Sequence, residues 1–116
     1  HSINCPTVGF KIYLPDGKVL LYNPDLADII AKEHILSAVD YYIGDGSTIK
    51  GNLLRRKGEM LSGHTSIPAQ IDWCKKYGIG NIIFTHIGRD TMNHEEDFIK
   101  LYPECTLAYD QMKIIL

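Results

Sequence analysis

The stretch Asn81-Ile82-Ile83-Phe84-Thr85-His86 decides the fold class of this chain. Its three consecutive apolar residues follow Gly80 and predict a buried strand. The segment before it predicts a helix, because Pro68 suits the first helical turn and Gly78 suits the position just after the last one. A helix that leads into a buried strand is typical of layered α/β proteins. We therefore expect His86 at the carboxyl end of a strand, where such proteins gather functional groups.

The first third of the chain predicts a hairpin followed by a helix. Apolar and polar residues alternate over Thr7–Leu14, and a second strand over Lys18–Tyr22 completes the hairpin through the turn Pro15-Asp16-Gly17. Apolar residues at helical spacing over Leu26–Leu36 predict a short amphipathic helix, and Asp25 is placed to act as its N-cap.

The remaining segments complete an alternating pattern of strands and helices. Val39–Ile43 is a compact β-rich run that predicts a buried strand, whereas Ile49–Met60 has no clear period and predicts a loop or a short helix. Thr91–Leu101 predicts another helix, and Thr106–Tyr109 and Lys113–Leu116 predict two short final strands. We expect one layered α/β domain that spans the whole chain of 116 residues.

The charge of the chain argues against a broad polyanion-binding surface. Its formal net charge is −2, whereas such surfaces depend on clustered lysines and arginines. The compact basic run is Arg55-Arg56-Lys57. It is either a solvated loop or a patch that contacts phosphate.

Composition and cysteine use indicate a soluble protein of a reducing compartment, for which we expect the cytoplasm. Cys5, Cys74 and Cys105 are far apart in sequence and odd in number, which argues against a disulfide framework and against a structural zinc site. No apolar run approaches the ~20 residues that span a bilayer, so we expect no membrane association. The chain begins at His1 without a methionine, so we expect that it has been cut, processed or numbered from inside a longer gene product.

Five polar residues are candidates for chemistry because each lies after an apolar strand, at a boundary between loop and helix, or at the terminus. They are His1, Asp25, Asp45, His64 and His86. Imidazoles and carboxylates are the natural ligands of Zn²⁺ and Mn²⁺, and a carboxylate can bridge two metals. Their spacing alone does not bring any two of them together.

Each candidate also has a purely structural interpretation. Asp25 could only cap a helix, Asp45 could only stabilise a turn, His86 could be a core histidine, and His1 could be a frayed terminus. We expect His34 and His94 to be exposed to solvent.

Six segments, in register along nearly the whole chain, resemble motifs of the metallo-β-lactamase superfamily, in particular its ribonuclease Z-like and PhnP-like branches. They are His1-Ser2 with Gly9–Ile12, Lys18–Asp25, Val39–Ser47, Gly63–Ser66 with the helix that follows, Asn81–Gly88, and Leu107–Met112. The resemblance implies a metal-dependent hydrolase, and the phosphodiesterase-like branches imply a phosphodiester or other ester as substrate.

The same resemblance implies a role for each candidate. His1, Asp25 and His86 match metal ligands, with Asp25 as the carboxylate that bridges two divalent ions, which are zinc or alternatively manganese or iron. His64 matches a histidine that contacts the scissile phosphate or acts as an acid, and Asp45 stands where ribonuclease Z-like members have a glutamate. Because Asp45 is one carbon shorter and Gly44 replaces the preceding histidine, true ribonuclease Z activity is not implied.

The family's H-x-H-x-D-H motif is absent from this chain, so we expect the C-terminal half of an αββα sandwich: one sheet with helices on its outer face. The complementary N-terminal half, or a second copy of the chain, would then cover an inner apolar face. We expect hydrolase activity only when the N-terminal half completes the domain. A non-catalytic protein-binding module, or an inactive fragment of the fold, is the alternative. The residues expected on the inner face are Val8, Phe10, Val19 or Leu21, and Ile82 or Phe84.

Overall fold

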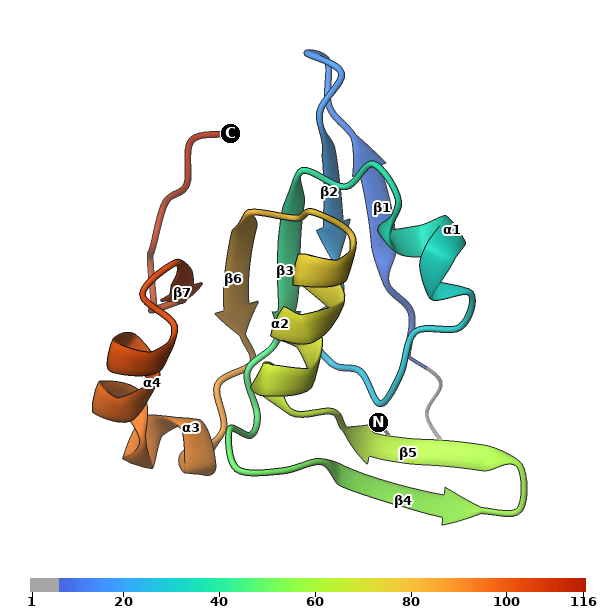
Figure 1. The fold of residues 1–116 in the computed structure, drawn as a ribbon, viewed down its shortest axis with the longest axis vertical. Helices are drawn as coiled ribbons and strands as arrows, with labels where there is room; N and C mark the ends of the chain where they lie inside the picture. The colour runs from blue at the N-terminus through green and yellow to red at the C-terminus, as the bar shows by residue number, and fades with distance from the viewer. Residues whose placement is uncertain (1–6) are drawn as a thin grey trace.

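The computed structural model describes residues 7–116, which form a mixed α/β fold with a central sheet and helices (Figure 1). The elements, in chain order, are β1 (Phe10–Tyr13), β2 (Val19–Tyr22), α1 (Lys32–Leu36), β3 (Tyr41–Asp45), β4 (Leu53–Lys57), β5 (Met60–His64), α2 (Ile67–Lys76), β6 (Asn81–Thr85), α3 (Arg89–Asn93), α4 (Glu95–Leu101) and β7 (Cys105–Leu107). The predicted α/β class is confirmed.

The central sheet has the strand order β1-β2-β3-β6-β7. The β1–β2 hairpin is antiparallel, and the pairs β2–β3, β3–β6 and β6–β7 are parallel. Parallel neighbours end at the same edge of a sheet, so β2, β3 and β6 deliver the residues that follow them to one edge. This edge carries the candidate site.

One face of the sheet forms the core with α2, which packs against β3 and β6 and lies in front of β3 in Figure 1. Leu21, Tyr42 and Ile82 are neighbours in register across three strands, and all are buried. They belong to one apolar cluster with Ile71 and Cys74 of α2. Burial of these side chains stabilises the fold, at roughly 1.5–3 kcal/mol for each large apolar residue.

The opposite face of the sheet is only partly covered. Tyr22, Ile43 and Ile83 lie there in register, and the C-terminal segment 108–114 helps to enclose a cavity of about 260 Å³ beside them. Phe10, the register partner of Tyr22, is 56% exposed. The sheet therefore has a helix-covered face and a partly covered apolar face, on which Ile83 is buried and Phe10 is exposed.

The expectation for the open face was right for some residues and wrong for others. Val8 and Phe10 are exposed, as expected. The exposure expected for Val19 or Leu21 and for Ile82 or Phe84 is wrong, because all four are buried in the core under the helices.

Helix α2 follows the prediction closely. Ser66 caps its start by accepting a hydrogen bond from the backbone of Ala69, and Pro68 lies in its first turn. Gly78 has φ 71° just after its end, a conformation that favours glycine. None of the helices within residues 7–116 has the length and apolar character that crossing a membrane requires.

Three other predicted elements need correction. The helix predicted over Leu26–Leu36 is shorter than expected and consists of α1 alone. Leu26 and Ile29 lie before it in an irregular segment, and their side chains are buried in the core. Its N-cap position is Ala31, so the N-cap predicted at Asp25 is wrong. The segment predicted over Thr91–Leu101 is divided between α3 and α4, and Lys113–Leu116 forms no strand.

The largest correction concerns Ile49–Met60, predicted as a loop or a short helix. The segment contributes β4, which pairs with β5 in a separate antiparallel sheet. Every residue of β4 is exposed, so no apolar face imposed a period of two on its sequence.

Of the two histidines expected to be exposed, His34 is exposed and His94 is partly buried.

Candidate metal centre

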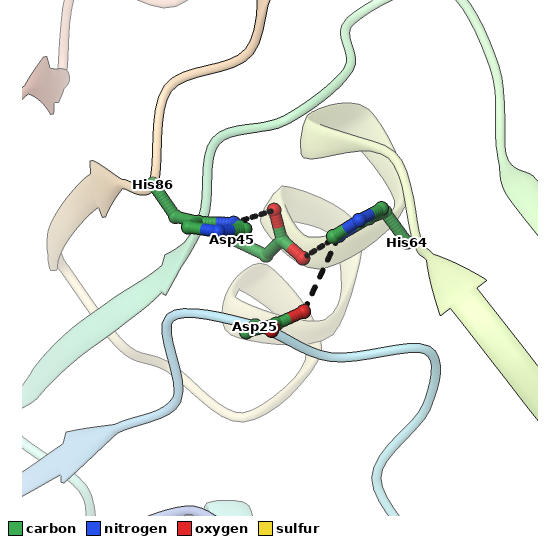
Figure 2. Close-up of side chains that lie close together, drawn as sticks. All are labelled: Asp25, Asp45, His64 and His86. Atoms are coloured by element: carbon green, nitrogen blue, oxygen red, sulfur yellow. Dashed lines mark hydrogen bonds and ion pairs between the residues drawn. The ribbon is translucent and has the colours of Figure 1, made fainter. Parts of the chain in front are cut away.

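Four side chains from four separate segments meet at the carboxyl edge of the central sheet (Figure 2). Asp25 lies after β2, Asp45 ends β3, His64 ends β5 and His86 follows β6. Nδ1 of His64 is 2.6 Å from Oδ2 of Asp45 and 3.5 Å from Oδ1 of Asp25. Nδ1 of His86 is 3.8 Å from Oδ1 of Asp45. One donor atom of each residue lies within 4.8 Å of the other three, so this group could hold a metal ion.

The parallel pairing of β3 with β6 explains why Asp45 and His86 meet. Asp45 and Thr85 are register partners at the ends of the two strands. Beyond them the amide of Gly46 donates to the carbonyl of Thr85 at 2.6 Å, and the amide of Gly88 donates to the carbonyl of Gly46 at 3.2 Å. His86 lies between these bonds with φ 54°, a left-handed conformation that is uncommon for a residue other than glycine and that clusters at functional sites.

The carboxylate of Asp45 is fully buried and is held by three donors. Its Oδ2 accepts from the amide of Leu26 at 3.0 Å, and its Oδ1 accepts from the amide and the hydroxyl of Ser47 at 2.9 and 2.5 Å. Burial of a carboxylate is costly unless hydrogen bonds replace its lost water. These bonds fix the carboxylate with Oδ2 toward His64.

The backbone of Asp45 is held just as firmly, by the buried side chain of Gln70 from α2. Oε1 of Gln70 accepts from the amide of Asp45 at 2.9 Å and from the Tyr42 hydroxyl at 2.8 Å. Nε2 of Gln70 donates to the carbonyl of Asp45 at 2.8 Å. Burial raises the pKa of Tyr42 well above its ordinary value, so its hydroxyl keeps the proton that it donates.

Ser47 occupies the middle of the cluster and was not among the sequence candidates. Its Oγ lies 3.2 Å from Nδ1 of His64 and 3.2 Å from Nδ1 of His86, in addition to its bond to Asp45. A polar turn directly after a buried strand was the available signal, because Ser47 follows Asp45-Gly46 there. Gln70 gave no such signal, since a glutamine within a helix is ordinarily exposed.

His64 is positioned by a glycine that no other residue can replace without strain. Gly63 has φ 108°, and a Cβ atom there would lie 1.8 Å from the carbonyl oxygen of Leu53 on the paired strand. The close approach of β4 to β5 therefore depends on the missing side chain.

Replacement of Gly63 by alanine is expected to destabilise the fold by more than about 1 kcal/mol, because it combines a disfavoured backbone with a clash. Chemical denaturation measures the loss. Gly51→Ala is the matched control, since a Cβ atom at Gly51 meets nothing within 4 Å. Equal stabilities of the two variants would contradict this account.

The loop between β3 and β4 is held by Asp90 of α3. Its Oδ2 accepts from the amide of Ile49 at 2.7 Å, from the amide of Lys50 at 3.0 Å and from the hydroxyl of Thr48 at 3.0 Å. The amides of Lys50 and Ile49 stabilise the ionised form and lower the pKa of Asp90.

A lowered pKa makes this contribution dependent on pH. Ionised Asp90 stabilises the folded state above its unfolded pKa, and the contribution is lost as pH falls through the lower folded pKa. We expect Asp90→Asn to be less stable than the wild type at neutral pH, with the difference shrinking below about pH 4. Unfolding free energies measured across this range test it, with the exposed Asp72→Asn as control. A difference that does not change with pH would contradict the assignment.

The candidates are brought together differently from the way the sequence suggested. Asp25 and His86, predicted as ligands, lie in one cluster with Asp45 and His64, predicted as catalytic residues. His1, the third predicted ligand, lies outside the described residues. The simple interpretations of Asp25 as an N-cap and of His86 as a buried core residue do not apply, because α1 starts well after Asp25 and the His86 side chain is 48% exposed.

The donor set fits a borderline divalent ion. Two imidazole nitrogens and two carboxylate oxygens suit Zn²⁺, Mn²⁺ or Fe²⁺. A cavity of about 680 Å³ reaches Asp25, and another of about 620 Å³ reaches His86, so the cluster is accessible from two sides. Among residues 7–116 the group contains no cysteine, and burial raises the pKa of Cys74 to about 12 and that of Cys105 to about 11.

Comparison with known proteins adds no assignment to this geometry. No family model matches the chain, and no curated protein sequence matches it either. The resemblance described for the six sequence segments therefore stays a prediction, and the site is interpreted from its own residues.

Proposed function

We propose that Asp25, Asp45, His64 and His86 form the divalent-metal centre of a hydrolase. The observation that carries the proposal is the convergence of their four donor atoms within 4.8 Å from four separate segments. Two further observations support it: two carboxylates lie around one histidine, and His86 has the left-handed backbone that clusters at functional sites.

In this proposal a bound divalent ion supplies Lewis acidity and an activated water nucleophile at neutral pH. Asp25, Asp45 and His86 hold it, and Ser47 orients Asp45 through its hydroxyl and amide. His64 contacts both carboxylates, and in this position it either completes the ligand set or assists the leaving group.

The resemblance of Gly63–Ser66 and Asn81–Gly88 to phosphodiesterase-like hydrolases supports a phosphodiester or related ester as substrate. Three of the four donors are sufficient for one ion that keeps a position open for water. The two-ion centre that the resemblance implies would need further ligands, for which His1 is the candidate in this chain.

The partly covered sheet face supports a two-layer sandwich in which this chain supplies one layer. Phe10, Tyr22, Ile43 and Ile83 lie on that face, opposite α2. Sheets of a sandwich pack through such apolar faces. We propose that a complementary N-terminal half of the same fold covers it and completes the centre, with a second copy of the chain as the other possible cover.

Calorimetric titration with Zn²⁺ and Mn²⁺ tests the metal centre directly. Stoichiometric binding is expected, and Asp25→Ala is expected to remove it, whereas the control Asp72→Ala on the exposed face of α2 retains it. Hydrolysis of a chromogenic phosphodiester is then assayed with metal and with chelator. A well-folded chain that binds neither metal would refute the proposal.

The open face also favours a second candidate, a non-catalytic module that binds another protein through Phe10 and its neighbours. Metal binding without hydrolysis, together with partner binding that Phe10→Ser weakens, would favour this candidate over the hydrolase.

A further inference from the structure

The β4–β5 ribbon is a projecting arm rather than part of the core. It forms its own two-stranded sheet and runs away from the central sheet at the lower edge of the molecule (Figure 1). All five residues of β4 are exposed. The contact of the ribbon with the rest of the chain is made by β5, in which Ser62 is buried, and β4 is held mainly by its pairing with β5.

Three consecutive cations, Arg55, Arg56 and Lys57, occupy most of β4. Within residues 7–116, no ion pair neutralises any of them. The chain as a whole carries a net charge of −2. The ribbon is therefore a local positive region on a slightly acidic protein, which attracts anions from solution.

The ribbon leads directly to the metal centre. Its strand β5 ends in His64, which pairs with Leu53 at the base of β4. Successive side chains of a strand point to opposite faces, so Arg55 and Lys57 share one face and Arg56 takes the other. Arg56 lines the cavity of about 680 Å³ that also reaches Asp25. Cations thus extend along the arm from the cluster outward, at about 3.3 Å per residue.

The base of the ribbon is fixed while its length stays exposed. Oδ1 of Asn52 accepts from the amide of Ser66 at 2.7 Å, and the amide of Thr65 donates to the carbonyl of Leu26 at 3.0 Å. The far end is a two-residue turn in which Gly58 has φ 62°, as a tight hairpin turn requires. The arm is held in a fixed direction from the cluster.

We propose that the β4–β5 ribbon binds the phosphate backbone of single-stranded nucleic acid through Arg55, Arg56 and Lys57. The further step, delivery of a phosphodiester to the cluster, rests on the proposed hydrolase function. A row of cations along an extended ribbon matches a linear polyanion, whose charges repeat along its length. An anionic membrane is disfavoured because Glu59 places a carboxylate at the tip, where the arm would meet the lipid.

Fluorescence anisotropy with a labelled single-stranded oligonucleotide tests the binding, in chelator so that the metal centre plays no part. Three phosphate contacts predict a slope of about −2 for log affinity against log salt, or about 15-fold weaker binding at 200 mM than at 50 mM salt. The variant R55A/R56A/K57A should lose at least tenfold in affinity at low salt and most of the slope.

The control variant K76A/K100A/K113A removes the same charge elsewhere and should bind within about twofold of the wild type. Circular dichroism verifies that both variants are folded. An equal loss in the control, unchanged binding by R55A/R56A/K57A, or binding to anionic vesicles in place of the oligonucleotide would overturn the inference. Binding of the oligonucleotide without metal-dependent cleavage, in the chain completed by its N-terminal half, would refute the hydrolase and leave the binding role of the ribbon intact. Metal-dependent hydrolysis of a small diester without oligonucleotide binding would support the hydrolase and refute nucleic-acid binding by the ribbon.

Discussion

Replacement of Asp45 by asparagine is expected to weaken divalent-metal binding by roughly 100-fold or more, since loss of an outer-shell partner alone costs 10–100-fold. The variant removes the negative charge at the centre of the cluster. It also turns an acceptor into a donor: Oδ1 faces two donors of Ser47 and Oδ2 faces the amide of Leu26. Either orientation of the new amide group sets it against an N–H, which costs about 1–3 kcal/mol of stability.

Titration with Zn²⁺ and chemical denaturation measure the two effects of Asp45→Asn separately. Asp72→Asn makes the same chemical change on the exposed face of α2 and should alter neither quantity. Retention of full metal affinity in a folded Asp45→Asn variant would show that Asp45 is a structural residue only.

Replacement of Gln70 by leucine is expected to produce the largest loss of stability, roughly 3 kcal/mol. The change keeps the size of the side chain but leaves the amide and carbonyl of Asp45 and the hydroxyl of Tyr42 without their buried partner. Each unsatisfied buried group costs about 1–3 kcal/mol, and the loss is not fully additive. Gly44 adds to the constraint, because a Cβ atom there would lie 2.4 Å from Oε1 of Gln70.

Chemical denaturation of Gln70→Leu measures this cost, with the exposed Gln111→Leu as control. Metal affinity should fall as well, because Gln70 positions the backbone of Asp45. If Gln70→Leu is as stable as the control, water replaces the side-chain amide of Gln70. The hydrogen bonds from Gln70 to the backbone of Asp45 would then be unnecessary for folding.

The sequence predicted the fold best where burial imposes a pattern. β6 and α2 have apolar residues at the expected spacing and clear boundary residues at Pro68 and Gly78. The β4–β5 ribbon was missed because both its faces meet solvent. The helix predicted over Leu26–Leu36 was too long, because tertiary contacts bury Leu26 and Ile29 from an irregular backbone.

The candidate site was predictable in its residue types but not in its arrangement. Strand ends identified Asp45 and His86, and a parallel sheet explains why they meet. The division of the candidates into metal ligands and catalytic groups came from the family resemblance. The position of His64 against Asp45 could not be predicted from spacing along the chain, because the unpredicted β4–β5 hairpin positions His64. The role of Gln70 could not be predicted either, because its hydrogen-bond partners lie on β3, far from it in sequence.

The four side chains of the cluster come from segments that only folding brings together. An ion bound by all four would have little affinity for the unfolded chain, so its concentration becomes a variable of folding. At one hundred times the dissociation constant, the ion would add about 2.7 kcal/mol to the free energy of unfolding. The melting temperature of this protein would then report the free metal in its surroundings, and a chelator would act as a mild denaturant.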